Sequence, residues 1–330
     1  MATLFVIPLA KRVAILNNVT SLPRPDRLHD TPTPYLGGVP IVLVAAAASP
    51  FIGKWELEAT VIIAGALLLG LVGLLDDIHN LRPGPRVFAE VCAALAAIAA
   101  GAHVQIFGGV LDAVLTVVWL VGVTNAFNLI DNMDGAAGGI ASATAVALLV
   151  TAWFNGQVLV GGLASVVAGT CIAFLVYNWH PARIFMGDAG ALPLGYLLAA
   201  IALKLRFPTV GHFASVTAIV LFTGPALFDT ALVVISRLAH HRPVYVGGTD
   251  HTSHRLLRLG IPTRAVATLI TVAAAACGAL GVAVGRGKID PWPVVVPLGL
   301  VGVLGLIALL RLPVDAPSPT DVHDAPAHRD

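Results

Sequence analysis

The chain has 330 residues, of which 57% are hydrophobic and only 11% are charged, and its mean hydropathy is +0.89. Soluble domains carry roughly 25% charged residues, so this composition excludes an ordinary soluble domain and indicates an integral membrane protein. The net charge of +1 offers no basic surface for nucleic acid, and the three cysteines are too dispersed for a disulfide or metal motif.

Apolar segments long enough to cross a membrane follow one another along nearly the whole chain. A spanning helix needs about 20 mainly apolar residues. Ten segments approach that length, at 36–53, 57–75, 86–102, 108–127, 136–154, 158–178, 189–205, 213–237, 264–285 and 292–311. The N-terminal ATLFVIPLA is too short to cross alone, so we interpret it as a truncated eleventh span or a shallow anchor; its flanks do not predict a cleaved signal peptide. The predicted fold class is an all-α polytopic membrane protein with about 10–11 transmembrane helices.

We predict a single integral-membrane domain over residues 1–311, with its polar motifs between 24 and 260. Residues 312–330 are rich in Pro, Asp and Ala, and we expect them to form a disordered cytoplasmic tail. When segment 11–35 is placed in the cytoplasm and the sides alternate, 14 of the 19 Lys and Arg residues fall on the cytoplasmic side. This bias is typical of cytoplasmic loops, and it predicts a multi-pass protein of the inner or plasma membrane with all its polar clusters facing the cytoplasm.

The first polar motif, GLLDDIHNLRPGPR, ends a span on Asp76 and Asp77. Adjacent helical residues point about 100° apart, so one carboxylate can face a reaction centre while a neighbour holds the other. Acids at a helix C-terminus oppose the helix dipole, which favours a functional role over a helix end that simply reaches water. The upstream RPDRLHDTPTPYLGGVPI predicts by itself only a turn before the second span.

The second motif, NAFNLIDNMDGAAGG, places polar residues between two spans. Asn125, Asn128, Asp131 and Asp134 recur every three residues, so successive members lie on neighbouring faces of a helix that we expect to end near Gly135. Amide and carboxylate oxygens are suited to a hard cation such as Mg²⁺, and also to the hydroxyls of a sugar. An Asn/Asp-rich turn explains two or three of these residues but not the whole set.

The third motif, YNWHPARIFMGDAGALPLG, places Asp188 immediately before a new helix. Two interpretations stay open from the residues alone. Asp188 is either an ordinary helix N-cap or a metal ligand beside a helix N-terminus, which is a favourable place for phosphate.

The fourth motif is the long loop RLAHHRPVYVGGTDHTSHRLLRLG. His251 and His254 lie three residues apart and, with Arg255, have the chemistry to grip a diphosphate. Zinc is the rival ligand, and the absence of cysteines disfavours it. Asp229, within a span, either faces the bundle interior or pairs with Arg237 eight residues later.

Acids, amides, imidazoles and guanidiniums at one membrane face are suited to phosphoryl transfer, in which positioning and charge neutralisation supply most of the catalysis. The residues alone therefore predict a Mg²⁺-dependent transfer between a soluble phosphate ester and a lipid. A polytopic lipid or sugar transporter is the alternative from another class. It predicts acids in mid-span and internal repeats, whereas here the acids gather at one membrane face and no repeat is visible.

Together with DHTSHRLLRLG, these motifs resemble, in the same order, those of the polyprenyl-phosphate N-acetylhexosamine-1-phosphate transferases, the family containing MraY and WecA. The resemblance spans residues 24–260. It implies transfer of a sugar-1-phosphate from a UDP-sugar to a polyprenyl phosphate such as undecaprenyl or decaprenyl phosphate. UMP leaves, and the lipid-linked product starts cell-envelope glycan synthesis. The implied cofactor is Mg²⁺, with Mn²⁺ as a substitute, and we keep a homodimer as an expectation.

The resemblance also implies roles for individual residues. Asp76 and Asp77 are the catalytic pair, one of them a base toward the acceptor phosphate. Asp188 is the expected metal ligand, with Asn128 close to the metal. The expected substrate-binding residues are Asp131, Asp134, Asn178, His251, His254 and Arg255.

The sequence departs from the family pattern at several positions: Arg86 replaces a lysine, Glu90 a glutamine, Ala191 a serine, Asn132-Met133 a Gly-Leu pair, and Ser253 the middle histidine of an HxHH pattern. These departures favour a WecA-like enzyme. A phospho-MurNAc-pentapeptide transferase of the MraY type is the alternative within the family, and the Asn-Met pair is where we expect altered donor choice.

Overall fold

The computed structural model describes residues 2–17, 19–21, 33–52, 56–245 and 248–312. The predicted disordered tail therefore lies almost entirely outside the described residues, as does the first half of the proline-rich motif at 24–41.

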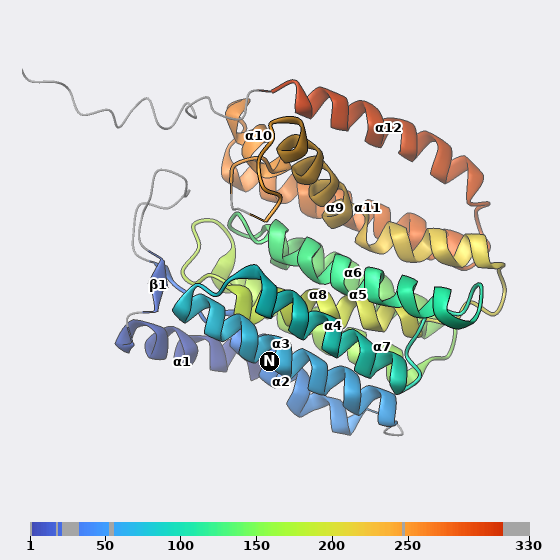
Figure 1. Cartoon of the computed structure of the whole chain (residues 1–330), viewed down its shortest axis with the longest axis horizontal. Coiled ribbons are helices and arrows are strands. Elements are labelled where there is room, and N and C mark those ends of the chain that lie inside the picture. The colour runs from blue at the N-terminus through green and yellow to red at the C-terminus, as the bar shows by residue number, and fades with distance from the viewer. Residues whose placement is uncertain (1, 18, 22–32, 53–55, 246–247, 313–330) are drawn as a thin grey trace, which may run out of the picture.

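Helices make up almost all of the described chain (Figure 1). They are α1 (Ala2–Leu16), α2 (Gly38–Ala48), the short η1 (Ser49–Phe51), α3 (Leu57–His79), α4 (Pro83–Ala99), α5 (Gly109–Ile130), α6 (Ala136–Phe154), α7 (Val158–Asn178), α8 (Asp188–Lys204), α9 (His212–Ala239), α10 (Thr252–Arg258), α11 (Thr263–Gly285) and α12 (Trp292–Leu310). Two short strands, β1 (Thr20–Ser21) and β2 (Thr33–Pro34), pair antiparallel. Each of the ten apolar segments overlaps one of these helices over most of its length, so the all-α prediction is confirmed.

Seven of the described helices are long and apolar enough to cross a membrane, namely α3, α5, α6, α7, α9, α11 and α12. The protein is therefore a multi-pass membrane protein. Helices α2, α4 and α8 are shorter, with 11, 17 and 17 residues, and the N-terminal segment forms α1 with 15. Figure 1 shows the long helices side by side, with α12 along one edge of the bundle and α1 and α2 along the other.

Helix α8 is the structural centre of the bundle. It packs against both α3 and α5, and almost all of its residues are buried. Glycines let its first turn approach two neighbours closely: a Cβ atom on Gly38 of α2 would lie 2.1 Å from the Cα atom of Gly190, and one on Gly73 of α3 would lie 2.2 Å from the carbonyl oxygen of Asp188. Because both contacts are with backbone, neither can relax through a side-chain rotation. The N-terminus of α8 is thereby fixed against α2 and α3.

This close approach yields a stability prediction. Gly38→Ala should lower the thermal midpoint of the detergent-solubilised protein markedly, because the added methyl group overlaps the backbone of Gly190. Gly169→Ala is the matched control, since Gly169 lies within α7 with open space around its Cα atom, and alanine there should be neutral or stabilising. Equal midpoints for the two variants would contradict the packing described here.

Candidate active site

Three helix ends meet at one end of the bundle and bring four acidic residues that are distant in sequence together. Asp76 and Asp77 lie in the last turn of α3, and Asp188 is the first residue of α8. Asp131 follows the last residue of α5. We call these four residues the acidic cluster. The fold thus assembles three of the sequence motifs into one site.

Arg86, in the first turn of α4, links two members of the acidic cluster. Its Nη1 atom lies 3.1 Å from Asp76 Oδ2 and 3.0 Å from Asp188 Oδ2. Asn128 donates from Nδ2 to Asp188 Oδ1 at 2.7 Å. Within the described part of the chain, the buried Arg86 Nε atom has no hydrogen-bond acceptor. The arginine therefore keeps one donor available at the site.

Asp77 is bound to the N-terminus of α8. Its two carboxylate oxygens each accept a backbone N–H at 3.0 Å, one from Asp188 and one from Ala189. Gly187 precedes this turn with φ +71°, and a Cβ atom there would lie 2.6 Å from Asp77 Oδ2. Glycine is thus required for both the backbone conformation and the close approach of the carboxylate. Gly187 is the N-cap residue of α8 and Asp188 is the first residue of the helix, so the interpretation of Asp188 as an ordinary N-cap is wrong.

Asp76 has a different set of partners. Its Oδ1 atom accepts the backbone N–H of Leu81 at 2.6 Å, while Oδ2 faces Arg86. The two adjacent carboxylates have separate surroundings, and both are held by protein groups. The expectation that one of them faces a reaction centre stays a prediction.

Asp131 lies in a turn. The expectation that the preceding helix continues to about Gly135 was therefore wrong. Helix α5 ends at Ile130, and residues 131–135 form a turn before α6. Turn formation by Asp and Asn competes with helix continuation, and Gly135 adopts φ +75°. Burial, followed by repulsion from neighbouring carboxylates including Asp188 and Asp77, raises the pKa of Asp131 to about 8. A carboxyl group in this setting favours a nearby cation or a hydrogen-bond acceptor.

Asp134 and Asn178 connect two segments next to the acidic cluster through hydrogen bonds. Asp134 Oδ2 lies 2.8 Å from His180 Nδ1 and accepts the N–H of Ala182 at 2.9 Å. Asn178, which is 3% exposed, accepts the N–H of Gly135 and donates to the carbonyl of Ile184, both at 3.0 Å. These contacts join the α5–α6 turn to the segment before α8. The prediction that both residues contact substrate stays a prediction.

A buried polar pair beneath the cluster was absent from the predicted site. Glu90 of α4 is 1% exposed and accepts a short hydrogen bond from Asn125 Nδ2 of α5. Each partner lies about one helical turn from Arg86 or Asn128. The sequence feature that could have indicated this pair is a glutamate in the middle of an apolar segment.

The His-rich loop is anchored to the end of α9. His251 Nδ1 lies 2.8 Å from Asp229 Oδ2, and Asp229 Oδ1 accepts the N–H of Thr252 at 2.7 Å. Arg237 pairs instead with Asp250, 3.3 Å from Nε to Oδ2. The proposed Asp229–Arg237 pair is therefore wrong, because eight residues along a helix separate two side chains by about 12 Å.

Arg255 is completely buried, and its guanidinium is surrounded by protein acceptors. Nε donates to the carbonyl of Asp250 at 2.9 Å, and Nη2 donates to Ser236 Oγ at 2.8 Å. Nη1 donates to the carbonyls of Leu309 at 2.6 Å and Leu312 at 2.8 Å. Arg255 thus ties α10 to α9 and to the end of α12, and its geometry lends no support to the expected grip on a diphosphate.

Among the described residues, no three His, Cys, Asp or Glu side chains form a closed metal-ligand set. The acidic cluster brings four carboxyl groups together, and the Arg86 guanidinium bonds to two of them, Asp76 and Asp188. Mg²⁺ is usually bound by one or two carboxylates together with substrate phosphates. The donor set therefore fits Mg²⁺ that is completed by substrate.

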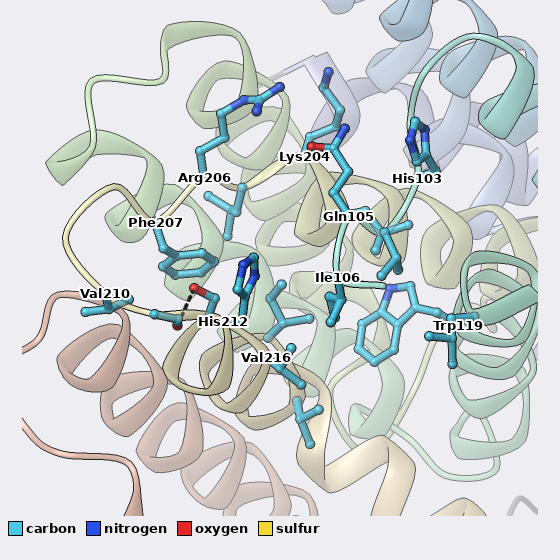
Figure 2. A pocket seen from close by; sticks show the side chains of 18 of the residues that line it. His103, Gln105, Ile106, Trp119, Lys204, Arg206, Phe207, Val210, His212 and Val216 are labelled. Carbon is cyan, nitrogen blue, oxygen red and sulfur yellow. Dashed lines mark hydrogen bonds between the residues drawn. The ribbon is translucent and has the colours of Figure 1, made fainter. Parts of the chain in front are cut away.

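A separate cavity of about 600 Å³ lies at the opposite ends of α5, α8 and α9 (Figure 2). Figure 2 shows His103, Lys204 and Arg206 toward one side of this cavity and the apolar Trp119 and Val216 toward the other. The residues that line it include no member of the acidic cluster or of α10. The cavity is therefore not the site of the predicted chemistry.

His254 yields a pH prediction. Burial and the neighbouring His251 lower the pKa of His254 to about 4, below about 6.5 in an unfolded chain. The unfolded state therefore binds the extra proton, so this contribution to stability is present above pH 6.5 and is lost as the pH falls toward 4. The thermal midpoint of His254→Gln should fall less over this interval than that of the wild type. The exposed His240→Gln is the control, and an equal fall in all three proteins would contradict the assignment.

Comparison with known sequences identifies the family. Residues 59–206 match the profile of Glycosyl transferase family 4. The chain is 32% identical, over 80% of its length and 76% of the other, to a probable undecaprenyl-phosphate N-acetylglucosaminyl 1-phosphate transferase of Bacillus subtilis. It is 27% identical, over 92% and 86%, to an undecaprenyl-phosphate alpha-N-acetylglucosaminyl 1-phosphate transferase of Yersinia pestis.

A phospho-N-acetylmuramoyl-pentapeptide-transferase of Limosilactobacillus fermentum is 36% identical over a shorter match, 53% of this chain and 60% of that protein. The wider coverage thus falls on the N-acetylglucosaminyl transferases. The helical bundle, the acidic helix ends and these similarities lead to one conclusion: the chain belongs to glycosyl transferase family 4, the MraY/WecA-like sugar-1-phosphate transferases.

Proposed function

We propose that this transferase uses the acidic cluster to move an N-acetylhexosamine-1-phosphate from a UDP-sugar to a polyprenyl phosphate, releasing UMP. The observation that carries the proposal is the Arg86 bridge between Asp76 and Asp188 at the meeting point of α3, α4, α5 and α8. A diphosphate donor and a phosphate acceptor both require cations in a site that otherwise carries excess negative charge. Arg86 supplies one positive charge and a spare donor at Nε.

Asp188, with Asn128 beside it, would hold Mg²⁺, or Mn²⁺ in its place. The bound metal would neutralise charge on the donor diphosphate. Asn128 orients the Asp188 carboxylate through its 2.7 Å hydrogen bond, and Asp77 fixes the backbone that carries it. Asp131, on the turn after α5, faces the same group of carboxylates and would bind the donor.

Asp76 is the better candidate for the base that receives the acceptor proton. Both oxygens of Asp77 are occupied by the backbone of α8, whereas Oδ2 of Asp76 contacts the guanidinium of Arg86 and no backbone N–H group. A phosphate monoester is already largely dianionic at neutral pH, since its second pKa is about 6. The contribution of Asp76 therefore includes orientation as well as proton transfer. Arg255, Asn178 and Asp134 would act as positioning residues.

The positions of the basic residues support a cytoplasmic active site. The described ends of α3, α5, α7 and α9 and the starts of α4, α6, α8 and α11 lie on the face that holds the acidic cluster. Most of the Lys and Arg residues that the structure describes lie at or between these helix ends, as expected for the cytoplasmic side. The transporter alternative has no support, because the chain belongs to a transferase family and its acids gather at one face. A homodimer stays a prediction.

Substitution of the two adjacent aspartates should have different effects on turnover and thermal stability. Asp77→Asn replaces an acceptor of two backbone N–H groups by an amide whose NH₂ opposes one of them, at a cost of about 1–3 kcal/mol. It should lose activity and thermal stability together. Asp76→Asn should lose turnover by two orders of magnitude or so with a smaller change in thermal midpoint. Near-normal turnover of Asp76→Asn in a purified assay would remove Asp76 as the base.

The reaction itself is tested by UMP release from UDP-GlcNAc, UDP-glucose and UDP-MurNAc-pentapeptide, each with and without undecaprenyl phosphate and Mg²⁺. We expect UMP from UDP-GlcNAc only when lipid and metal are both present, and none after chelation. UMP release from UDP-MurNAc-pentapeptide, and from neither of the other two donors, would establish the MraY-type alternative instead. No UMP from any donor would refute the proposed function.

A further inference from the structure

Two departures from the family pattern contact each other in the fold. Asn132 lies in the α5–α6 turn, and Ser253 lies in α10, 121 residues later. Ser253 Oγ lies 2.6 Å from Asn132 Oδ1 and 3.3 Å from His254 Nδ1. Ser253 is completely buried and His254 is 8% exposed. A chain of three polar side chains thus joins the His-rich loop to the turn that carries Asp131.

The direction of each hydrogen bond in this chain follows from donor counting. Asn132 Nδ2 donates to the carbonyl of Leu129 at 2.9 Å, which leaves Oδ1 as the atom facing Ser253. Because Oδ1 is only an acceptor, the Ser253 hydroxyl must donate its single hydrogen to it. Ser253 Oγ can then only accept from His254, so the His254 Nδ1 atom carries a hydrogen.

His254 is also unfavourable as a cation. It is buried, its ring centroid lies 5.8 Å from that of His251, and Arg258 is a further positive neighbour; Asp229 and Asp250 oppose them only partly. A neutral imidazole with its hydrogen on Nδ1 has a bare lone pair on Nε2. Such a nitrogen accepts a hydrogen bond and has nothing to donate to a phosphate oxygen.

We propose that the Asn132–Ser253 contact sets the tautomer of His254, and that His254 Nε2 thereby recognises a hydroxyl or amide N–H group of the UDP-sugar rather than its diphosphate. Asn132 and Ser253 are positioning residues, and His254 is the specificity-determining residue. This proposal rests on the function proposed above and assigns the His-rich loop to selection of the donor sugar. It also gives a physical reason for the Asn-Ser pair, because a histidine at position 253 would not impose this order of donors and acceptors.

The tautomer is tested by solid-state NMR of the full protein with ¹⁵N-labelled histidine in lipid bilayers, without substrate. The His254 signal is identified by its loss in His254→Gln, and we expect hydrogen on Nδ1. Asn132→Ala should free the Ser253 hydroxyl to donate to Nδ1, which moves the hydrogen to Nε2. Asn132→Asp retains the acceptor and should retain the wild-type tautomer. Hydrogen on Nε2 in the wild type would overturn the proposal.

The recognition step is tested by comparing KM for UDP-GlcNAc with the inhibition constant of UDP, which has the diphosphate but no sugar. Asn132→Ala and His254→Ala should raise KM roughly three- to tenfold, the effect of one lost hydrogen bond, and leave inhibition by UDP unchanged. His240→Gln, an exposed histidine near the same loop, should change neither quantity. Equal weakening of UDP would mean that His254 contacts the diphosphate, and the proposal would fail.

These outcomes are distinguishable from failure of the proposed function. If the wild type released no UMP from any UDP-sugar, the proposed function would fail. An active wild type whose KM and UDP inhibition change together in Asn132→Ala would refute only the donor-recognition role.

Discussion

The gathering of like charges at the N-terminus of one buried helix is the constraint on which the rest of this structure depends. Four carboxyl groups come together at one end of the helical bundle, where they are largely buried and water screens them poorly. The fold offsets their repulsion with the Arg86 guanidinium, the Asn128 amide and two backbone N–H groups of α8. Each of these groups belongs to a different helix or turn, so the site exists only when the helices are packed.

The position of α8 follows from that requirement. Its first turn must bring backbone N–H groups to Asp77, and glycines at positions 38, 73 and 187 remove the atoms that would keep its neighbours apart. The residual negative charge remains unbalanced by protein groups that bond to the cluster. A divalent cation bound together with phosphate substrates would supply the missing positive charge, as proposed for this site.

In the His-rich loop, most charged side chains bond to other groups of the protein. Arg255 and Arg237 are almost completely buried, and both donate to protein acceptors. His251 contacts the carboxylate of Asp229. Most charged residues of the loop therefore determine its shape. In the proposed role of His254 as a donor-binding residue, its hydrogen-bond polarity is set by Ser253 and Asn132. The proposed donor selection therefore depends on the architecture of the loop.

The sequence by itself determined the all-α membrane class, the ten apolar helices and the motifs that carry Asp76, Asp77, Asn128 and Asp188. It could do so because span length and hydropathy are local properties of the chain. Only the tertiary structure decided the partners: Asp229 with His251, Arg237 with Asp250, Glu90 with Asn125, and the end of α5 at Ile130. Each of these pairings depends on distances between helices, and in the turn on a competition between side-chain and backbone hydrogen bonds. The spacing of residues along the sequence determines neither the distances between helices nor the outcome of this competition, so these pairings could not be predicted from the sequence.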